Sequence, residues 1–471
     1  MSGRFLSPRK IALIISLLLL LFAGCTSAAR PESAPSEAPT EAPPASPDPT
    51  PVPAVTVGGK VFSPFDRTLD LSDPDIDIDT LCEKAGEFQR VERIDMGLME
   101  PDAKRIQQIG RAFPDAELFW RMELPCGTVS ESERVLDLSG MTSGEIGEIC
   151  GILPLLKALE KIVLIPEDGV TSLEPDVIGM LSEAAPAAEI EFCYDLFGQR
   201  AGNDTKELRY SETDIGDDGI AVFRAVLPYM KELKLLRLYD CGIRDYDAMA
   251  ALRGDFPDVN VVWSIEITGS QFMTDTTLMH NPLLRDKHVH LLQYFPDIIY
   301  LDIGHNHYLT SVDFIKYLPK LQVAILSITR ISDISALAGC PDLEFCELFN
   351  SHIADLSPLA GLKKLEYLNI GDMPYVRDIS PIYGIESLKM VRICGSTFNW
   401  VKADQVEELK ARLPGCVVSD GGGDPTTSGG WRFDAQHNYT ERYALLREQM
   451  LYDIPDWKKR QSNSPSADTG E

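Results

Sequence analysis

The sequence predicts an α/β fold: a right-handed, curved solenoid with parallel strands on its concave face and helices, then 3-10 turns, on its convex face. Three observations predict it. From Ile298 onward the spacing L-x-x-L-x-L recurs in steps of 23, 22, 22 and 23 residues. Upstream, three sequence markers recur together about every 70 residues. Several spacers between these markers have the apolar periodicity of a helix.

Residues 1–24 are expected to be a signal peptide. Basic residues precede an apolar run, Ile11 to Ala23, that is too short to cross a bilayer of ~30 Å. The run ends at Phe22-Ala-Gly-Cys25, which resembles the lipobox of bacterial lipoproteins, although Phe22 replaces the usual aliphatic residue. The resemblance implies cleavage before Cys25 and attachment of a diacylglycerol to its thiol. The mature protein would then lie on the outer face of a cell membrane, lipid-anchored and extracytoplasmic. A plain secretory signal and an uncleaved anchor are the alternatives.

Residues 25–56 are expected to form a disordered stalk. Ala28 to Pro53 consists almost entirely of Ala, Pro, Ser, Thr and Glu, and nine prolines fall between Pro31 and Pro53. This composition cannot build a core, and proline favours extended polyproline II. The stalk would hold the following segment away from the lipid.

Residues 57–420 are expected to form the solenoid. Upstream of the regular repeats, a Leu-rich strand marker recurs with spacings of 67, 72 and 70 residues, and a Pro turn marker and a second strand marker run in parallel. The first marker begins at Leu69, Leu136, Leu208 and Leu278; the Pro marker begins at Phe113, Ala185 and Phe256; the second strand marker begins at Arg93, Lys161 and Leu236. Each unit of about 70 residues therefore holds about three repeats. Since no repeat covers its own apolar face, neighbouring repeats must stack.

The spacers predict what lies opposite the strands. Asp102–Gly110 and Asp218–Leu227 have helical periodicity, whereas spacers after Leu321 are too short for more than a turn. From about Ile298 to Phe398 the repeats resemble the 22-residue leucine-rich repeats of internalins, a class of bacterial surface proteins. Spacers such as Ile331-Ser-Asp-Ile-Ser-Ala-Leu337 carry this resemblance. It implies a short strand that alternates with a 3-10 turn.

Residues 421–460 are expected to cap the C-terminal end of the solenoid, and residues 461–471 to be a disordered tail. Glycines at 421–423 mark a loop, and Thr440–Tyr452 reads as an amphipathic helix that would close the end together with Trp431. A separate partner-binding helix is the alternative.

The predicted ligand-binding site lies on the concave face. Within each repeat, the residues that flank the inward Leu point out of the solenoid, and many of them are large and apolar. An exposed apolar stripe with a polar rim favours an interaction surface. These residues could instead pack against one another or under a loop. The predicted site residues are Tyr300, Asp302, Val323, Ile325, Phe345, Glu347, Phe349, Tyr367, Asn369, Met390 and Arg392.

No metal or cofactor is expected. Five histidines crowd together, namely His280, His288, His290, His305 and His307. Pairs two apart on a strand could chelate a metal, but no Cys pair or H-E-x-x-H motif completes a site, so ordinary histidines are favoured. His280 aligns with inward-facing positions. The acids of Asp75–Asp79 lack the Gly and Glu of a calcium loop and indicate a helix N-terminus. Removing Cys25 leaves nine cysteines without common spacing, so no disulfide framework is expected.

The charge and the missing motifs limit the function. The chain has 72 acidic and 44 basic residues, which argues against binding to nucleic acid. No nucleophile elbow, phosphate loop or zinc signature is present, so no enzyme activity is expected. We expect a monomeric, membrane-tethered lipoprotein that binds a protein or peptide at the cell surface and acts in adhesion. The alternative is an envelope carbohydrate binder or hydrolase that stacks sugars on the exposed aromatics and uses Asp302 or Glu347 as acid or base.

Overall fold

The computed structural model describes residues 54–393 and 401–452. The chain divides into two units, residues 1–54 and residues 55–471, and nearly all described residues belong to the second. The predicted signal peptide, Cys25, almost all of the predicted stalk and the predicted tail lie outside the described residues. The predicted stalk ends slightly too late, because Val55 already begins a strand and is buried.

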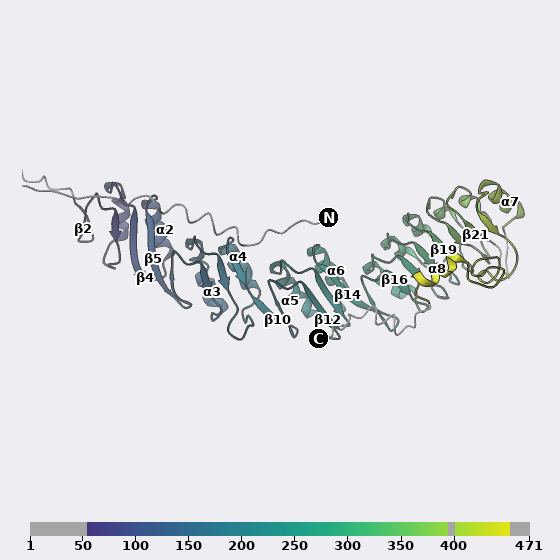
Figure 1. The fold of residues 1–471 in the computed structure, drawn as a ribbon, viewed down its shortest axis with the longest axis horizontal. Coiled ribbons are helices and arrows are strands. Elements are labelled where there is room, and N and C mark those ends of the chain that lie inside the picture. The colour runs from purple at the N-terminus through teal and green to yellow at the C-terminus, as the bar shows by residue number, and fades with distance from the viewer. Residues whose placement is uncertain (1–53, 394–400, 453–471) are drawn as a thin grey trace, which may run out of the picture. The chain divides into compact units, whose positions relative to one another are not determined.

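Parallel strands are arranged in four successive blocks (Figure 1). A short hairpin, β1 (Val55–Val57) and β2 (Lys60–Phe62), precedes them. Block 1 has β3 (Thr68–Asp70), β4 (Arg93–Met99) and β5 (Glu117–Leu124); block 2 has β7 (Val135–Asp137), β8 (Lys161–Val163) and β9 (Glu189–Glu191); block 3 has β12 (Glu207–Ser211), β13 (Leu235–Tyr239) and β14 (Asn260–Ile267). Each 70-residue unit thus contributes three parallel strands, as its markers predict.

Block 4 is a sheet of seven strands in sequence order. Its strands are β16 (Leu278–His280), β17 (Tyr300–Asp302), β18 (Val323–Ile325), β19 (Phe345–Glu347), β20 (Tyr367–Asn369), β21 (Met390–Arg392) and β22 (Val417–Ser419). All adjacent pairs are parallel, and equivalent residues of consecutive repeats are partners, such as Leu301 with Ala324. This register is that of a leucine-rich-repeat solenoid.

Antiparallel hairpins end the first three blocks, and the repeat pattern does not predict them. They pair β5 with β6 (Gly127–Ser130), β10 (Cys193–Leu196) with β11 (Gln199–Gly202), and β14 with β15 (Ser270–Met273). Two of the turns are the dipeptides Phe197-Gly198 and Thr268-Gly269, in which both residues have positive φ. Such turns suit the twist of a hairpin.

Helices lie between the strands of blocks 1 to 3, and 3-10 helices replace them in block 4 from β16 to β21, whereas α7 lies between β21 and β22. The helices are α1 (Ile78–Glu83), α2 (Ala103–Ala112), α3 (Ser143–Ile149), α4 (Asp176–Ala184), α5 (Asp218–Val226), α6 (Tyr246–Asp255), α7 (Ala403–Arg412) and α8 (Glu441–Gln449). The 3-10 helices are η2 (Ala85–Glu87), η3 (Leu153–Leu155), η4 (Leu227–Tyr229), η5 (Asp286–Tyr294), η6 (Asp313–Tyr317), η7 (Ser335–Gly339), η8 (Ser357–Leu359) and η9 (Ser380–Ile382). The predicted change from helices to 3-10 turns is confirmed.

The acidic run Asp75–Asp79 caps a helix, as expected. The side chain of Asp77 accepts hydrogen bonds from the backbone N–H groups of Asp79 and Thr80 at the start of α1. Hydrogen bonds from Thr80 lower the pKa of Asp77. A charged cap at this position satisfies N–H groups that have no partner within the helix.

The solenoid core lies between the strands and the helical segments. In each block 4 strand from β16 to β21 the middle residue is buried in this core, as Leu301, Cys346 and Leu368 are. The alignment of His280 with inward positions is wrong: Met279 fills the core position and His280 is exposed. The strand marker that begins at Leu278 is shifted by one residue relative to the marker that begins at Leu69, and a shift of one residue turns a side chain to the other face of the sheet.

The C-terminal segment, residues 420–452, does not close the end of the solenoid as expected. It turns back, and α8 lies on the block 4 sheet beside β16 and β19 (Figure 1). The predicted helix is present and is capped by the Thr440 hydroxyl. Trp431 packs against Phe345 of β19 instead of the last strand, with ring centroids 5.3 Å apart.

Candidate functional site

The predicted site residues do point away from the solenoid core. The first and third residues of the block 4 strands form what we call the sheet face, opposite the buried middle residues. Ten predicted residues belong to it: Tyr300, Asp302, Val323, Ile325, Phe345, Glu347, Tyr367, Asn369, Met390 and Arg392. Phe349 follows β19 and is also buried. The strand register brings these residues together as the repeat spacing predicts.

The expectation that this face is exposed is wrong for its centre, β18 and β19, although Val417 at its end is 61% exposed. Val323, Ile325 and Phe345 are 1%, 6% and 2% exposed, because the C-terminal segment packs on them. The segment contributes Trp431, Tyr443, Leu446, Met450 and Tyr452 to this second apolar cluster. The apolar column therefore buries its surface against the same chain, which is the physical reason for its composition.

Polar groups of the sheet face are also paired with the segment. Glu347 is fully buried, and its Oε1 accepts a hydrogen bond of 2.5 Å from Trp431 Nε1. Its Oε2 lies 3.7 Å from Arg432 Nη2. Burial raises the pKa of Glu347, while Arg432 and Trp431 oppose this rise. The segment thus places a cation beside a carboxylate that would otherwise be buried alone.

Three further contacts fix the two ends of the segment. Near its start, Asn369 Nδ2 donates to the Pro425 carbonyl at 3.0 Å, and Arg392 Nη1 donates to the Gly421 carbonyl at 2.7 Å. At its end, the Tyr452 hydroxyl donates to Asp302 Oδ2. The segment is held along its length and crosses several repeats.

A small cavity remains between the segment and the sheet. It has a volume of about 220 Å³ and is lined by Phe345, Tyr367 and residues of the segment. The Arg442 guanidinium lies over the rings of Phe345 and Tyr367, 5.2 and 5.6 Å from their centroids. Burial lowers the pKa of Arg442. The aromatics that could stack on a sugar are occupied by this cation.

The carboxylates named for hydrolysis are likewise covered. Asp302 accepts the Tyr452 hydroxyl, and Glu347 accepts the Trp431 indole N–H. Neither is open to a substrate while the segment is docked. The geometry therefore does not support the catalytic roles that the alternative assigns to them.

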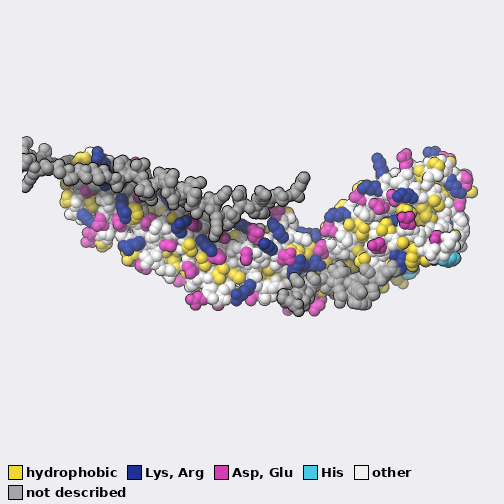
Figure 2. Space-filling view, in the orientation of Figure 1, with side chains coloured by type: hydrophobic (Ala, Val, Ile, Leu, Met, Phe, Trp, Pro, Cys, Tyr) yellow, Lys and Arg dark blue, Asp and Glu magenta, His cyan; other side chains and the backbone are white. Residues whose placement is uncertain are grey.

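Blocks 1 and 2 carry an uncovered counterpart of the sheet face. Together with β12, their outward strand residues form what we call the charged strand face, on which none is buried. Its residues are Thr68, Asp70, Arg93, Asp95, Leu98, Glu117, Phe119, Arg121, Glu123, Val135, Asp137, Lys161, Val163, Glu189, Glu191, Glu207, Arg209 and Ser211. Figure 2 shows basic and acidic side chains interspersed over the visible side of this part of the molecule.

The charged strand face has an excess of acids. Three of its four bases pair with an acid of the face: Arg93 with Asp95 at 3.9 Å, Lys161 with Glu191 at 2.6 Å, and Arg209 with Glu207 at 2.8 Å. The fourth, Arg121, has no acid within ion-pair distance among the described residues. Asp70, Glu117, Asp137 and Glu189 have no cation within ion-pair distance among the described residues. The sequence analysis does not predict this face, because the predicted site was identified by apolar residues at outward strand positions and most outward residues here are charged.

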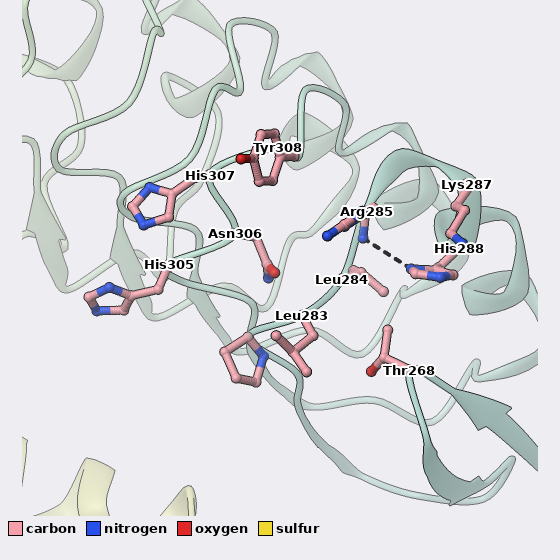
Figure 3. Close-up of a pocket in the computed structure, with 11 residues that line it drawn as sticks. Thr268, Leu283, Leu284, Arg285, Lys287, His288, His305, Asn306, His307 and Tyr308 are labelled. Carbon is pink, nitrogen blue, oxygen red and sulfur yellow. Dashed lines mark hydrogen bonds between the residues drawn. The ribbon is translucent and has the colours of Figure 1, made fainter.

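The histidines do not form the strand pairs that would favour chelation. His288 and His290 lie in η5, and His305 and His307 lie in the loop after β17. Within residues 54–393 and 401–452, no group of three or more His, Cys, Asp or Glu side chains could hold a metal ion. His288, His305 and His307 instead line one pocket (Figure 3).

Eight cysteines lie in the described part of the chain, and all of them are free thiols. Cys241 and Cys346 are buried at repeat positions, as expected. Burial raises the pKa of Cys241 and of Cys340 to about 11, so both are protonated at neutral pH. In the same described residues, no helix combines the length and the apolar character needed to cross a membrane.

Comparisons with known proteins give only structural neighbours. No family model matches the sequence, and no curated protein matches it. Internalin C2 of Listeria monocytogenes is 23% identical, over 48% of this chain and 83% of that one, with a TM-score of 0.26. A leucine-rich-repeat protein of Leptospira interrogans is 16% identical over 71% and 91%, with a TM-score of 0.28. The Listeria internalin InlF is 14% identical over 74% and 93%, with a TM-score of 0.25. At these TM-scores, the assignment of the fold rests on the strand register described above.

Proposed function

We propose that this protein is a membrane-tethered, extracytoplasmic leucine-rich-repeat lipoprotein that binds a protein partner through its charged strand face and acts in adhesion. The observation that carries the binding proposal is the contrast between the two strand faces. The centre of the sheet face of block 4 is covered by the chain itself, whereas no segment within residues 54–393 and 401–452 covers the charged strand face.

The charge of the open face selects the chemistry of the partner. Eight acids and four bases lie on it, and three of the four bases are already paired. The acids that have no cation partner would attract a basic protein segment and would repel acidic surfaces. Phe119, which packs 3.5 Å from the Arg93 guanidinium, and the half-exposed Val163 offer apolar contact within this field.

A charge-reversal variant tests the proposed face. We would change Glu117, Asp137 and Glu189 to Lys and photocross-link the full chain on intact cells that express it. The matched control changes Glu148, Glu183 and Glu232 to Lys; these exposed acids lie on α3, α4 and the segment after η4. Both variants have the same net charge, so only the location of the charge differs.

The expected result is that wild type and the control variant give the same cross-linked proteins, detected by mass spectrometry. The strand-face variant loses them by about tenfold or more, because like charges across an interface oppose association. Equal recovery by the two variants would refute binding through this face. A partner that is strongly acidic would refute the proposed charge complementarity.

Lipid anchoring is proposed on the resemblance of Phe22-Ala-Gly-Cys25 to a lipobox. It is tested by growing cells that express the full chain with labelled palmitate. We expect label in the wild-type protein and none in a Cys25→Ala variant, which should leave the membrane fraction. Label in the variant would place the lipid elsewhere, and an unlabelled wild type would refute the anchor.

A further inference from the structure

A concave pocket of about 390 Å³ lies where block 3 meets block 4 (Figure 3). Three loops build it, each following a strand. Thr268 comes from the turn of the β14–β15 hairpin, residues 282–288 follow β16, and residues 305–308 follow β17. The pocket is separate from the sheet face and from the charged strand face.

The floor of the pocket is fixed by buried hydrogen bonds. Asn306 is 3% exposed, and its Nδ2 donates to the carbonyls of Asn281 at 2.8 Å and Ile303 at 2.7 Å. Asn281 is also buried, and its Nδ2 donates to Thr268 Oγ1 at 2.9 Å. These bonds tie the three loops together, so the pocket is preformed, which lowers the entropy cost of binding.

The lining of the pocket is cationic in an otherwise acidic chain. Arg285, Lys287 and three histidines line it, and none of the described Asp and Glu residues does, although the chain has 72 acids and 44 Lys and Arg. Among the described residues, neither Arg285 nor Lys287 has an ion-pair partner. Cations without partners at the wall of a cavity create a site of positive potential.

The nearest acid in sequence is turned away from the pocket. Asp286 lies between the two cations, but its carboxylate accepts hydrogen bonds from the backbone N–H and the hydroxyl of Thr310, at 2.9 and 2.7 Å. The pKa of His288 is lowered by burial and by the positive charges of Lys287, Arg285 and His290. The direction of this shift agrees with a cationic environment.

Apolar side chains stand at the rim of the same pocket. Leu283 and Tyr308 are each 64% exposed, although large apolar residues usually avoid water. The Arg285 guanidinium lies 5.4 Å from the centre of the Tyr308 ring. Figure 3 shows Tyr308 and Leu283 on either side of Arg285. A ligand that reaches the cations would also cover these two side chains.

We propose that this pocket binds a small organic anion, in which a phosphate or carboxylate group is carried on an apolar or ring-shaped body. The anionic group pairs with Arg285 and Lys287, and the body packs against Leu283 and Tyr308. The guanidinium can form two parallel hydrogen bonds to such a group, which gives orientation as well as attraction. This proposal does not depend on the partner of the charged strand face.

Calorimetric titration of the full chain tests the proposal with three probes of similar size: phenyl phosphate, benzoate and benzyl alcohol. EDTA is present to remove trace metals. Binding of phenyl phosphate or of benzoate, with no binding of benzyl alcohol, is the expected result, and the comparison of the two anions identifies the preferred group. Failure of both anions to bind at millimolar concentration overturns the proposal, as does equal binding of the neutral alcohol.

A pair of variants locates the site. Arg285→Gln combined with Lys287→Gln is expected to weaken binding of the anion by about tenfold or more, because charge-assisted hydrogen bonds are lost. The control combines Arg90→Gln with Lys363→Gln, which removes the same charges from exposed positions outside the pocket and should leave the affinity unchanged. Thermal melting verifies that both variants fold. Equal affinities of the two variants would show that the anion binds elsewhere and would refute the site.

Discussion

At the scale of single residues, four consecutive repeats in block 4, those of β17 to β20, have a left-handed backbone at one position after the strand. His305, Ile328, Asn350 and Asp372 occupy it, with φ of 63°, 58°, 52° and 46°. Asn and Asp tolerate this conformation because their short polar side chains bond locally, whereas a β-branched residue is strained there. Ile328 is therefore the poorest choice of the four.

Replacing Ile328 by Asn is predicted to stabilise the protein. The side chain is only half-buried, so relief of about 1 kcal/mol of backbone strain should exceed the lost apolar contact. The reciprocal change, Asn350→Ile, should destabilise by a similar amount. Urea denaturation followed by circular dichroism measures both. An Ile328→Asn protein with a lower midpoint than wild type would contradict this account of the turn.

Glu347 predicts a pH dependence for the docked C-terminal segment. Burial raises the pKa of this carboxyl above the ordinary value of 4.5 when the segment is docked. The docked state therefore favours the protonated form, and docking should be strongest below that ordinary value and weaken as pH rises through the raised pKa. Trp431 fluorescence follows this change. In a Glu347→Gln protein the dependence should be absent, and an unchanged dependence would assign it to another group.

At the scale of elements, the sequence predicts those features that repeat and misses those that occur once. Strands at Leu301 or Cys346, the helices at Ala103–Ala112 and Asp218–Val226, and the later 3-10 turns follow from periodic apolar positions. The Phe197-Gly198 and Thr268-Gly269 hairpins do not, because they interrupt the repeat.

The candidate site shows the same division between local and distant information. Strand alternation places Tyr300, Phe345 and Tyr367 on one face, as predicted. The packing of the C-terminal segment over these residues could not be predicted, because Trp431 lies 84 residues after its partner Glu347 in the chain. Contacts between residues so far apart in the chain leave no local pattern. The apolar column of the strands and the apolar residues of the C-terminal helix were the only signal that the two could pack together.

Two neighbouring leucines in α8 test the docking of this element. Leu446 is fully buried against the sheet face, whereas Leu445 is 47% exposed. Leu446→Ala should weaken docking by about 2–5 kcal/mol, because it leaves a cavity in the second apolar cluster. Leu445→Ala should have little effect. Limited proteolysis of the segment measures the difference, and equal cleavage rates in the two variants would contradict the packing of α8.

At the scale of the whole molecule, one repeat pattern produces two kinds of strand face. In blocks 1 and 2 the outward residues are mostly charged and open, and in the central strands of block 4 they are apolar residues and paired polar residues under the C-terminal segment. The covered face is part of the folded protein, and the open face is left for a partner. This division is the central claim, because the proposed binding face depends on it.

Hydroxyl-radical footprinting of the full chain tests this division most directly, since it reports the exposure of aromatic side chains to solvent. Phe345, Trp431 and Tyr443 should be strongly protected, whereas Tyr308 and Tyr375, which are 64% and 50% exposed, should react rapidly. Modification of Phe345 and Trp431 at the rate of Tyr308 would show that the segment is not docked, and would contradict the account.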